Sequence, residues 1–320
     1  MSSSATPDPV GISVVVVNWN SRDDLAACLD ALAAQSDGDF ETIVVDNGST
    51  DGSVEMVRAR FPAVRIVETG ANLGFAEGCN RGIEVARQPW VATLNNDADA
   101  APGWIAALRA AAASGDARLG MLQSRIVFKQ DDTRTNSTGL LLYANGCAED
   151  RHYDQPVRPD ESPEEIFCPS AGAALYRRAM LDELRLDSGV FDRDYFMYAE
   201  DVDLGWRARL AGWSSIYVPT AVVRHSFQGS SRRHGPNFVE LQCKKNRLRT
   251  LVKNASLPFL LRTIPRTLGD LAEATLKGGP AMIPAFALAA ASAVRQRARV
   301  GRLVRVSRRA IERRWVTRTP

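Results

Sequence analysis

Polar residues that can bind a metal ion or a nucleotide follow four apolar segments near the start of the chain. The four runs are Asn18–Ser21, Asp46–Gly52, Asn72–Gly78 and Asn95–Asp99. Each comes after a segment of β-branched or other apolar residues, a pattern that predicts a buried strand. Ligands of doubly wound sheets bind beyond the carboxyl ends of the strands. We therefore expect the four runs to share one crevice.

The residue types in these runs favour a site for a diphosphate and a divalent cation. No G-x-G-x-x-G follows the first predicted strand, which disfavours a dinucleotide site, and the absence of G-x-x-x-x-G-K-[ST] excludes a P-loop. The runs offer carboxylates and amides instead. Because bare carboxylates repel a diphosphate, their presence implies a bridging hard cation, Mg²⁺ or Mn²⁺.

Strands and helices alternate through the first hundred residues, which predicts an α/β fold with a mostly parallel sheet and right-handed crossovers. The predicted strands are Ile12–Val17, Ile43–Val45, Val64–Val67 and Trp90–Leu94. Residues 123–155 are polar and irregular, with strand-like pieces at Ile126–Phe128 and Leu140–Tyr143.

The second half of the chain changes character near residue 235. A helix is predicted at Glu200–Ala211 and a strand at Ser215–Val223, and from Asn237 onward the pattern is helical with no strand signal. We therefore predict three parts: a disordered leader (1–10), an α/β catalytic domain (11–235) and a helical, basic C-terminal extension (236–320).

Composition narrows the class of protein. The formal net charge of +3 gives no electrostatic case for nucleic-acid binding. Five scattered cysteines without C-x-x-C spacing fit a reducing compartment, so we expect a cytoplasmic protein. The longest apolar stretch, Ala281–Val294, contains Pro284 and falls short of the roughly 20 residues that a membrane-spanning helix needs.

Several ordered motifs resemble glycosyltransferase family 2, and within it bacterial rhamnosyltransferase-like enzymes. The motifs lie between about residues 12 and 250: VVVVNWN, VVDNGSTDGS, TGANLGFAEGCNRG, LNNDA, PSAGAALYRR, FDRDYFMYAEDVDLGWRARLAGW and VRHS. The resemblance implies a Rossmann-like A-type glycosyltransferase fold. It also implies transfer of a sugar from a nucleotide donor to a hydroxyl group.

The resemblance assigns the nucleotide-binding residues to the first three runs. Asp46 matches the carboxylate that accepts a hydrogen bond from the imide N–H of uracil or thymine, although an Asx-type turn is the alternative. Trp19 matches a residue beside the base and could stack on it or simply belong to the core. Asn72 and Gly74 begin the loop that approaches the ribose or diphosphate.

The same resemblance assigns the metal and the donor sugar. Asn96 and Asp97 stand where the family has an Asp-x-Asp motif, so Asp97 is the remaining carboxylate for the metal. His225 matches a position that completes the metal site. Gly172 belongs to a small-residue loop beneath the donor sugar. Asp99 could be a second ligand, but a surface acid is the simpler interpretation.

A catalytic base is implied in the acidic pair Glu200–Asp201, where Asp201 matches the family's base. An inverting transfer needs one carboxylate to take the proton from the attacking hydroxyl group. Both residues fall at the start of a predicted helix, whose dipole should keep Asp201 ionised. Ordinary first-turn acids are the alternative.

The end of the chain is strongly basic. From residue 295 onward there is one acid, Glu312, and ten arginines: Arg295, Arg297, Arg299, Arg302, Arg305, Arg308, Arg309, Arg313, Arg314 and Arg318. This composition is typical of a peripheral helix on an anionic membrane, here the inner face of the cell membrane, which would suit a lipid-linked acceptor. A solvated helix or a homodimer contact is the alternative.

Three functions can be weighed against these residues. The first is an inverting glycosyltransferase that uses a dTDP- or UDP-sugar, with dTDP-rhamnose as the leading donor by resemblance, in cell-envelope polysaccharide assembly. The second is a catalytically silent sugar-binding or assembly scaffold at the membrane, which the presence of Asp97 and Asp201 disfavours. The third is a sugar-nucleotide pyrophosphorylase, which would need a Gly-rich phosphate loop after the first strand.

Overall fold

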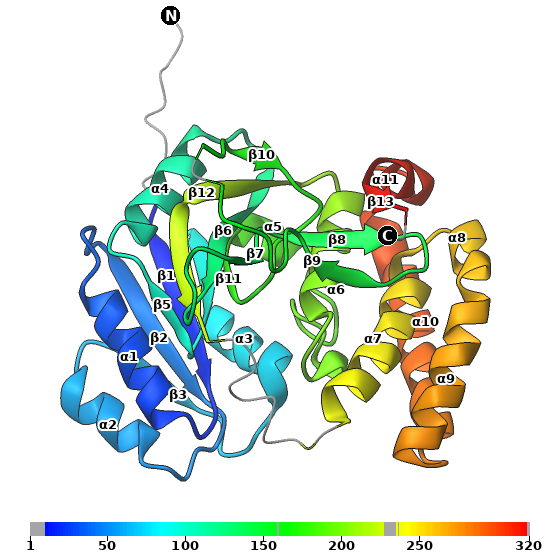
Figure 1. Ribbon diagram of the computed structural model, residues 1–320, viewed down its shortest axis with the longest axis horizontal. Helices are drawn as coiled ribbons and strands as arrows, with labels where there is room; N and C mark the ends of the chain where they lie inside the picture. Colours follow the sequence, from blue (N-terminus) through cyan, green and yellow to red (C-terminus); the bar gives the residue numbers. More distant parts are fainter. Residues whose placement is uncertain (1–9, 159, 227–234, 236, 319–320) are drawn as a thin grey trace, which may run out of the picture.

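The computed structural model describes residues 10–158, 160–226, 235 and 237–318. Figure 1 shows a twisted sheet with helices on both faces and a further group of helices beside it. The strands are β1 (Ile12–Asn18), β2 (Phe40–Asp46), β3 (Arg65–Glu68), β4 (Trp90–Asn95), β5 (Ala98–Ala100), β6 (Leu119–Phe128), β7 (Thr135–Ser137), β8 (Leu140–Tyr143), β9 (Ala148–Asp150), β10 (Glu164–Glu165), β11 (Ala173–Arg177), β12 (Ser214–His225) and β13 (Val316–Thr317). The helices are α1 (Arg22–Ala33), α2 (Ser53–Arg60), α3 (Gly74–Val85), α4 (Trp104–Ser114), α5 (Arg178–Glu183), α6 (Glu200–Leu210), α7 (Phe238–Asn254), α8 (Leu257–Arg262), α9 (Ile264–Gly278), α10 (Met282–Leu303) and α11 (Arg308–Trp315), with a 3₁₀ turn at Arg193–Tyr195.

The central sheet has the strand order β10-β12-β6-β11-β4-β1-β2-β3. β1 pairs in parallel with β2 and β4, and β2 pairs in parallel with β3, as the strand–helix alternation predicts. β11 runs antiparallel between β4 and β6, whereas β12 is parallel to β6. The predicted α/β fold with a mostly parallel sheet and a C-terminal helical region is confirmed.

Alternation along the buried strands builds one apolar core on each face of the sheet. Val14 and Val16 of β1 pack with α1, α2 and α4, where Trp104 is fully buried. Val15 of the same strand packs with α3, α5 and α6 on the opposite face. Successive side chains of a strand point to opposite faces, so a continuous run of valines supplies both cores.

A third core joins the catalytic region to the C-terminal helices. Its buried members include Leu142 of β8, Trp206 of α6, Leu251 of α7 and Val300 of α10. Trp206 is fully buried there, so it is a core residue and does not line a binding site. Burial of each such side chain contributes about 1.5–3 kcal/mol. The helical extension is therefore packed against the α/β region.

The C-terminal end departs from the all-helical expectation. β13 pairs in parallel with β8, with Val316 opposite Leu142, and β8 pairs with β9 in a separate three-stranded sheet. A two-residue strand at the end of an arginine-rich segment carries no periodic signal, and it forms only because β8 offers a free edge. The end of the chain thus braces the β8–β9 hairpin.

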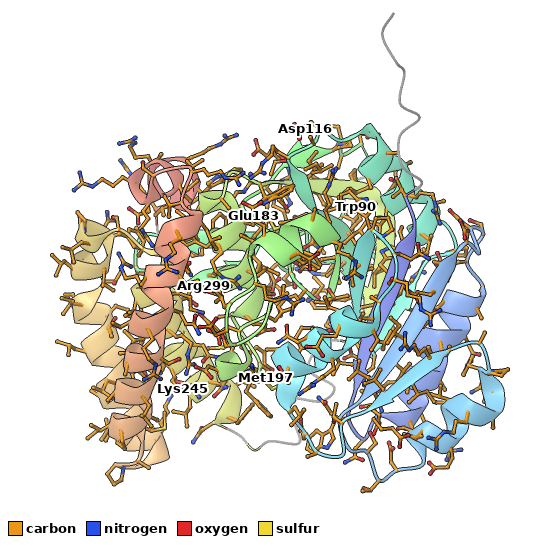
Figure 2. All side chains as sticks on the ribbon, turned by 180° about the vertical axis from the view of Figure 1, so that it is seen from behind. Trp90, Asp116, Glu183, Met197, Lys245 and Arg299 are labelled. Atoms are coloured by element: carbon orange, nitrogen blue, oxygen red, sulfur yellow. The ribbon has the colours of Figure 1, made fainter. Side chains whose placement is uncertain are left out.

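Several of the terminal arginines bind the protein itself. Arg297 donates to the carbonyl groups of Val252 and Ala255 at 2.6 and 2.8 Å, and Arg308 donates to that of Asn254 at 3.0 Å. Arg299, labelled in Figure 2, donates to the carbonyl group of Arg185 at 3.0 Å. These three arginines thus help to hold the C-terminal extension against the rest of the protein.

Two predictions from the sequence fall on segments that the structure describes only in part. Of the predicted disordered leader, residues 1–9 lie outside the described residues. The predicted boundary near residue 235 falls beside residues 227–234 and 236, which also lie outside them. None of the helices in the described part combines the length and the apolar content needed to cross a membrane.

A buried ionic cluster fastens α7 to the α/β region. Lys253 of α7 forms ion pairs with Asp192 and, at 3.1 Å, with Asp203 of α6, and all three side chains are fully buried. Arg207 also pairs with Asp203, at 2.9 Å, and Asn254 donates to it at 2.7 Å. These contacts compensate the cost of removing the charges from water.

Replacing Lys253 with methionine should therefore leave Asp192 as an uncompensated buried charge. We expect the free energy of unfolding of Lys253→Met to fall by about 3–5 kcal/mol, measured by chemical denaturation. Lys277→Met, which breaks partly exposed pairs with Glu240 and Glu273, is the matched control and should cost much less stability. Equal losses in the two variants would contradict this role of the buried cluster.

Candidate functional site

A cavity of about 610 Å³ opens at the carboxyl ends of the central strands. This volume lies within the usual range for small-molecule sites, which is roughly 300–1,000 Å³. The cavity collects most of the residues singled out from the sequence. The predicted residues that line it are Trp19, Asn72, Gly74, Asn96, Asp97, Gly172, Glu200, Asp201 and His225.

Asp46 is the one predicted site residue that does not line this cavity. It ends β2, and only 3% of its surface is exposed. One carboxylate oxygen accepts a hydrogen bond from the Ser49 amide at 2.8 Å, and the other lies 3.4 Å from the Asn18 side-chain amide. Its neighbour Asn47 lines the cavity instead. The contact with the Ser49 amide, three residues on, is a local turn hydrogen bond.

Asp97 and His225 face each other across the strand ends. His225 Nε2 lies 3.0 Å from Asp97 Oδ1 and 3.0 Å from the side-chain amide nitrogen of Asn95. The other ring nitrogen, Nδ1, lies 3.1 Å from Asn136 Oδ1. An amide oxygen only accepts hydrogen bonds, so Nδ1 carries a proton and donates it. Nε2 is the ring nitrogen that faces the Asp97 carboxylate.

The imidazole nitrogen of His225 and the carboxylate oxygen of Asp97 are close enough to share a proton or to bind the same cation. Imidazole and carboxylate both suit Mn²⁺, and carboxylate also suits Mg²⁺. Among the residues that the structure describes, no group of three or more His, Cys, Asp or Glu side chains is placed to hold a metal ion. Asp97 and His225 are suited by residue type to be two ligands of a divalent cation. The other oxygens of a full coordination shell would have to come from elsewhere.

Asp99 is not part of this pair. It forms an ion pair with Lys129 at 2.7 Å, with both side chains about one third exposed. The simpler interpretation, a surface acid, agrees with this contact.

Asp201 lines the same cavity at the start of α6. Its two carboxylate oxygens accept hydrogen bonds from the amides of Ala171, at 3.1 Å, and Val202, at 2.8 Å. Burial raises the pKa of Asp201 above its usual value, and the two amide hydrogen bonds oppose that shift. The sequence predicts that the helix N-terminus keeps Asp201 ionised, and burial of the carboxylate acts against that effect.

Glu200 is the neutral partner in the acidic pair. Burial, and then the negative charge of Asp201, raise the pKa of Glu200 well above its usual value. Within the described part of the chain, Glu200 Oε2 has no hydrogen-bond partner. An ionised carboxylate in that position would be costly, so the protonated form is favoured.

The segment before α6 has an unusual backbone. Phe196, Tyr198 and Ala199 have φ angles of 63°, 71° and 65°, the left-handed region that side chains other than glycine rarely adopt. Each such residue costs of order 1–3 kcal/mol and persists only when its surroundings hold it. We call residues 196–199 the left-handed segment, and Figure 2 labels Met197 within it.

Asn246 of α7 holds this segment in place. Its side-chain amide nitrogen donates to the carbonyl groups of Tyr195, Met197 and Tyr198 at 3.0, 3.0 and 2.8 Å. Gln242, one turn earlier on α7, donates to the Tyr195 carbonyl group at 2.6 Å. Asn246 is fully buried. The extension therefore supplies the groups that fix the approach to Glu200 and Asp201.

The left-handed segment also contacts the first turn of α3. The Phe196 carbonyl group accepts a hydrogen bond from the Ala76 amide at 3.1 Å. A Cβ atom on Gly74, whose φ is +81°, would overlap the Phe196 carbonyl oxygen and ring. Glycine is thus required at position 74 by both conformation and space. One strained segment links two walls of the cavity.

The far half of the cavity was not predicted from the sequence. It is lined by the β8–β9 hairpin, including Glu149 and Asp150, and by residues of α7 and α9, including Arg247 and Arg266. Burial raises the pKa of Asp150 to about 6. Asp150 lies in the irregular stretch 123–155, where no pattern singles it out, and only the pairing of β8 with β9 and β13 brings it to the cavity.

A family model described as "Glycosyl transferase family 2" matches residues 13–185. A curated relative, the N-acetylglucosaminyl-diphospho-decaprenol L-rhamnosyltransferase of Mycobacterium tuberculosis, is 32% identical over 246 residues. That alignment covers 69% of this chain and 78% of the relative.

Two solved structures are similar in fold. GalNAc-T7, determined with UDP, GalNAc and Mn²⁺, aligns with a TM-score of 0.60 and 16% identity over 76% of this chain, and the aligned region spans 48% of the GalNAc-T7 chain. The mannosyltransferase PcManGT from Pyrobaculum calidifontis, in complex with GDP-Man and Mn²⁺, aligns with a TM-score of 0.55 and 18% identity. That alignment covers 95% of this chain and 87% of PcManGT.

Removing the Asn246 side chain should free the left-handed segment. We expect Asn246→Ala to increase amide hydrogen exchange across residues 193–203, because strained backbone relaxes when its hydrogen-bond donor is lost. Gln35→Ala is the matched control, since Gln35 donates to the carbonyl groups of Ala31 and Ala101 on the other side of the sheet. Faster exchange in residues 193–203 of both variants, or of neither, would refute the role given to Asn246.

Proposed function

The chain belongs to glycosyltransferase family 2, and from the geometry of its cavity we propose how it transfers a sugar from a nucleotide donor. We propose an inverting transfer in which Asp201 is the base and dTDP-rhamnose is the leading donor. The observation that carries the proposal is that one cavity holds both groups. Asp201 lines it at the start of α6, and the Asp97–His225 pair lines it at the strand ends.

The donor assignment draws on similarity and on the residues at the strand ends. The relative that is 32% identical is an L-rhamnosyltransferase by name, which favours rhamnose over other sugars. Trp19 is half-buried and lines the cavity beside Asn47, so its ring can stack on a pyrimidine. We keep Asp46 as the partner of the base imide, although reaching it requires the base to approach a largely buried carboxylate.

Gly172 and Asn96 complete the proposed donor site. The Gly172 carbonyl group accepts from the Asn95 amide at 2.9 Å, and a side chain at this position would extend into the cavity beside Asn95. Asn96 donates to Asn18 at 2.8 Å, which fixes its side chain beneath the strand ends. Small or tethered groups here leave room for the sugar and diphosphate.

Asp97 and His225 are the residues that would hold a divalent cation. Mg²⁺ or Mn²⁺ bound there supplies positive charge that balances the diphosphate leaving group. The donor's own phosphate oxygens are suited to fill the remaining coordination positions, since two protein ligands do not complete a shell.

Asp201 would act directly on the acceptor. Its two oxygens are oriented by the amides of Ala171 and Val202, so the carboxylate is fixed before substrate binds. The acceptor hydroxyl oxygen attacks the anomeric carbon, the bond from that carbon to the diphosphate breaks, and the hydroxyl proton passes to Asp201. A pKa raised toward neutrality makes the carboxylate a better proton acceptor. Attack from the side opposite the leaving group inverts the anomeric centre.

The acceptor would occupy the far half of the cavity, between the β8–β9 hairpin and the extension. We propose a glycan or lipid-linked acceptor there, with the C-terminal arginines near an anionic membrane surface. Arg297, Arg299 and Arg308 bind backbone carbonyl groups of the protein. The membrane contact therefore rests on the remaining exposed arginines.

Asp201→Asn and Glu200→Gln separate the two members of the acidic pair. Asparagine cannot accept the proton, so we expect kcat of Asp201→Asn to fall by about 10²–10⁴. Glutamine mimics a protonated glutamate, so Glu200→Gln should stay within about tenfold of wild type. Nucleotide release with a sugar acceptor is the measurement. Comparable losses in both variants would overturn the assignment.

The pH dependence follows from the direction of the Asp201 shift. A base must be deprotonated, so kcat/KM falls as pH drops through its pKa. Because burial raises that pKa, the acid limb should lie above the ordinary aspartate range of about 4. Glu200→Gln should leave the limb in place, since Glu200 is already neutral beside an ionised Asp201. A limb at the ordinary aspartate value would contradict a buried base.

Donor binding should depend on Asp97. A ligand that binds only the native state raises the melting temperature by mass action. We expect such a rise with dTDP- or UDP-sugar plus Mn²⁺ or Mg²⁺, its loss with EDTA, and its loss in Asp97→Ala. Asp99→Ala is the matched control and should respond as wild type does. The absence of any rise with every pyrimidine nucleotide would remove the donor assignment.

A further inference from the structure

Large apolar side chains are exposed almost entirely on one part of the protein. Among the described residues, those with high exposure are Tyr153 and eight residues of the helical extension. The eight, which we call the apolar face, are Leu257, Leu261, Ile264, Leu268, Leu276, Ile283, Leu288 and Val294. Contiguous apolar surface is rare on a soluble monomer and marks a contact site.

The apolar face follows the outward side of successive helices. On α9 the exposed side chains at helical spacing are Ile264, Leu268, Ala272 and Leu276, and Leu276 is 87% exposed. On α10 the exposed series at helical spacing is Ile283, Ala287, Ala291 and Val294, and the exposed Leu288 lies beside it. A surface helix normally turns such a stripe toward the core. Here the stripe faces outward, at the edge of the molecule farthest from α1 and α2 (Figure 1).

The charged residues exposed around the apolar face are mostly basic. Between Leu257 and Arg318, the exposed basic residues are Arg262, Arg266, Lys277, Arg295, Arg299, Arg302, Arg305, Arg309, Arg313, Arg314 and Arg318. Of the three acids of this segment, Asp270 is buried, Glu312 is half-buried, and Glu273, whose side chain is 46% exposed, pairs with Lys277 at 2.7 Å. A shallow hollow between α8 and α11 brings Arg262, Arg309, Arg313 and Arg318 together.

We propose that the apolar face binds an anionic lipid bilayer, with α8, α9 and the first half of α10 lying in the plane of its surface. Leucine and isoleucine side chains enter the acyl region, and the basic rim contacts the phosphate groups of the lipids. A second copy of this chain fits the same face poorly. A two-fold interface would set one basic rim against the other, and like charges repel.

The apolar face borders the cavity that we assign to the acceptor. Arg266 of α9 is exposed on the surface and also lines that cavity, as does Asp270, with which it forms an ion pair at 3.0 Å. A membrane beneath α9 would bring a lipid-linked acceptor to the far half of the cavity. This step rests on the proposed function, whereas the membrane contact itself does not.

The test is co-sedimentation of the full chain with two kinds of vesicle: phosphatidylcholine alone, and phosphatidylglycerol and phosphatidylcholine in equal parts. We expect the protein to bind the mixed vesicles, and salt to weaken the binding by screening. Leu268→Ser/Leu276→Ser should lower partition about tenfold or more, since two exposed apolar groups are lost. Arg262→Gln/Arg309→Gln should lower it chiefly on the anionic vesicles.

Control variants remove similar groups elsewhere. Tyr153→Ser removes the exposed aromatic group outside the extension, and Arg58→Gln removes an exposed arginine of α2. Both should bind vesicles as wild type does. Because the substituted leucines are exposed, their variants should unfold at the wild-type temperature, which verifies that a loss of binding is not a loss of fold.

Two results would overturn the proposal. One is equal vesicle binding by wild type and the leucine variant, and the other is a wild-type dimer that ignores vesicles and dissociates in the leucine variant. The nucleotide-dependent rise in melting temperature is measured on the same variants without lipid. That rise persists if only the membrane contact is wrong, and it is absent in wild type if the donor assignment is wrong.

Discussion

The cavity depends on keeping residues 196–199 in a backbone conformation that their side chains disfavour. Three non-glycine residues with positive φ cost of order 1–3 kcal/mol each, so the segment needs compensation from outside itself. Asn246 supplies it through hydrogen bonds to three carbonyl groups, and Gln242 adds a fourth contact. The segment leads directly into α6, where Asp201 is the second residue, and its Phe196 carbonyl group contacts the first turn of α3. Strain at this point thus sets the distance between two walls of the site.

The helical extension is therefore part of the site and of its support. α7 carries Asn246, contributes Lys253 to the buried ionic cluster, and lines the far half of the cavity. β13 then returns from the end of the chain to pair with β8 and brace the hairpin that bears Asp150. Transfer of a sugar needs an acceptor that is held close to an oriented base. The contacts of α7 and β13 fix the part of the cavity where we propose that the acceptor binds. The inner side of the extension packs against the α/β region and supports the site. Its outer side carries the apolar face, which is exposed.

Local signals explain which parts could be predicted from the sequence. The valine run of β1 and the polar residues after β1 to β4 depend only on neighbours in the chain, so the strands, the family and the shared crevice followed from them. The left-handed segment could not be predicted, because Phe196 to Ala199 have no special propensity and the cause, Asn246, lies some 50 positions later in the chain. Asp150 and β13 depend on each other's pairing in the same way. The number of arginines near the end of the chain predicts a membrane-binding tail. Composition cannot predict that Arg297 and Arg308 donate hydrogen bonds to carbonyl groups of the protein itself.

The most direct test of the account is the anomeric configuration of the product. The protein would be incubated with a pyrimidine nucleotide-sugar that it binds and with a sugar acceptor, and the new glycosidic linkage would be read by NMR. A single base at Asp201, in the cavity that the Asp97–His225 pair also lines, predicts attack from the face away from the diphosphate. We therefore expect a product with inverted configuration at the anomeric carbon. A product with retained configuration would contradict it, because retention requires a different arrangement of reacting groups.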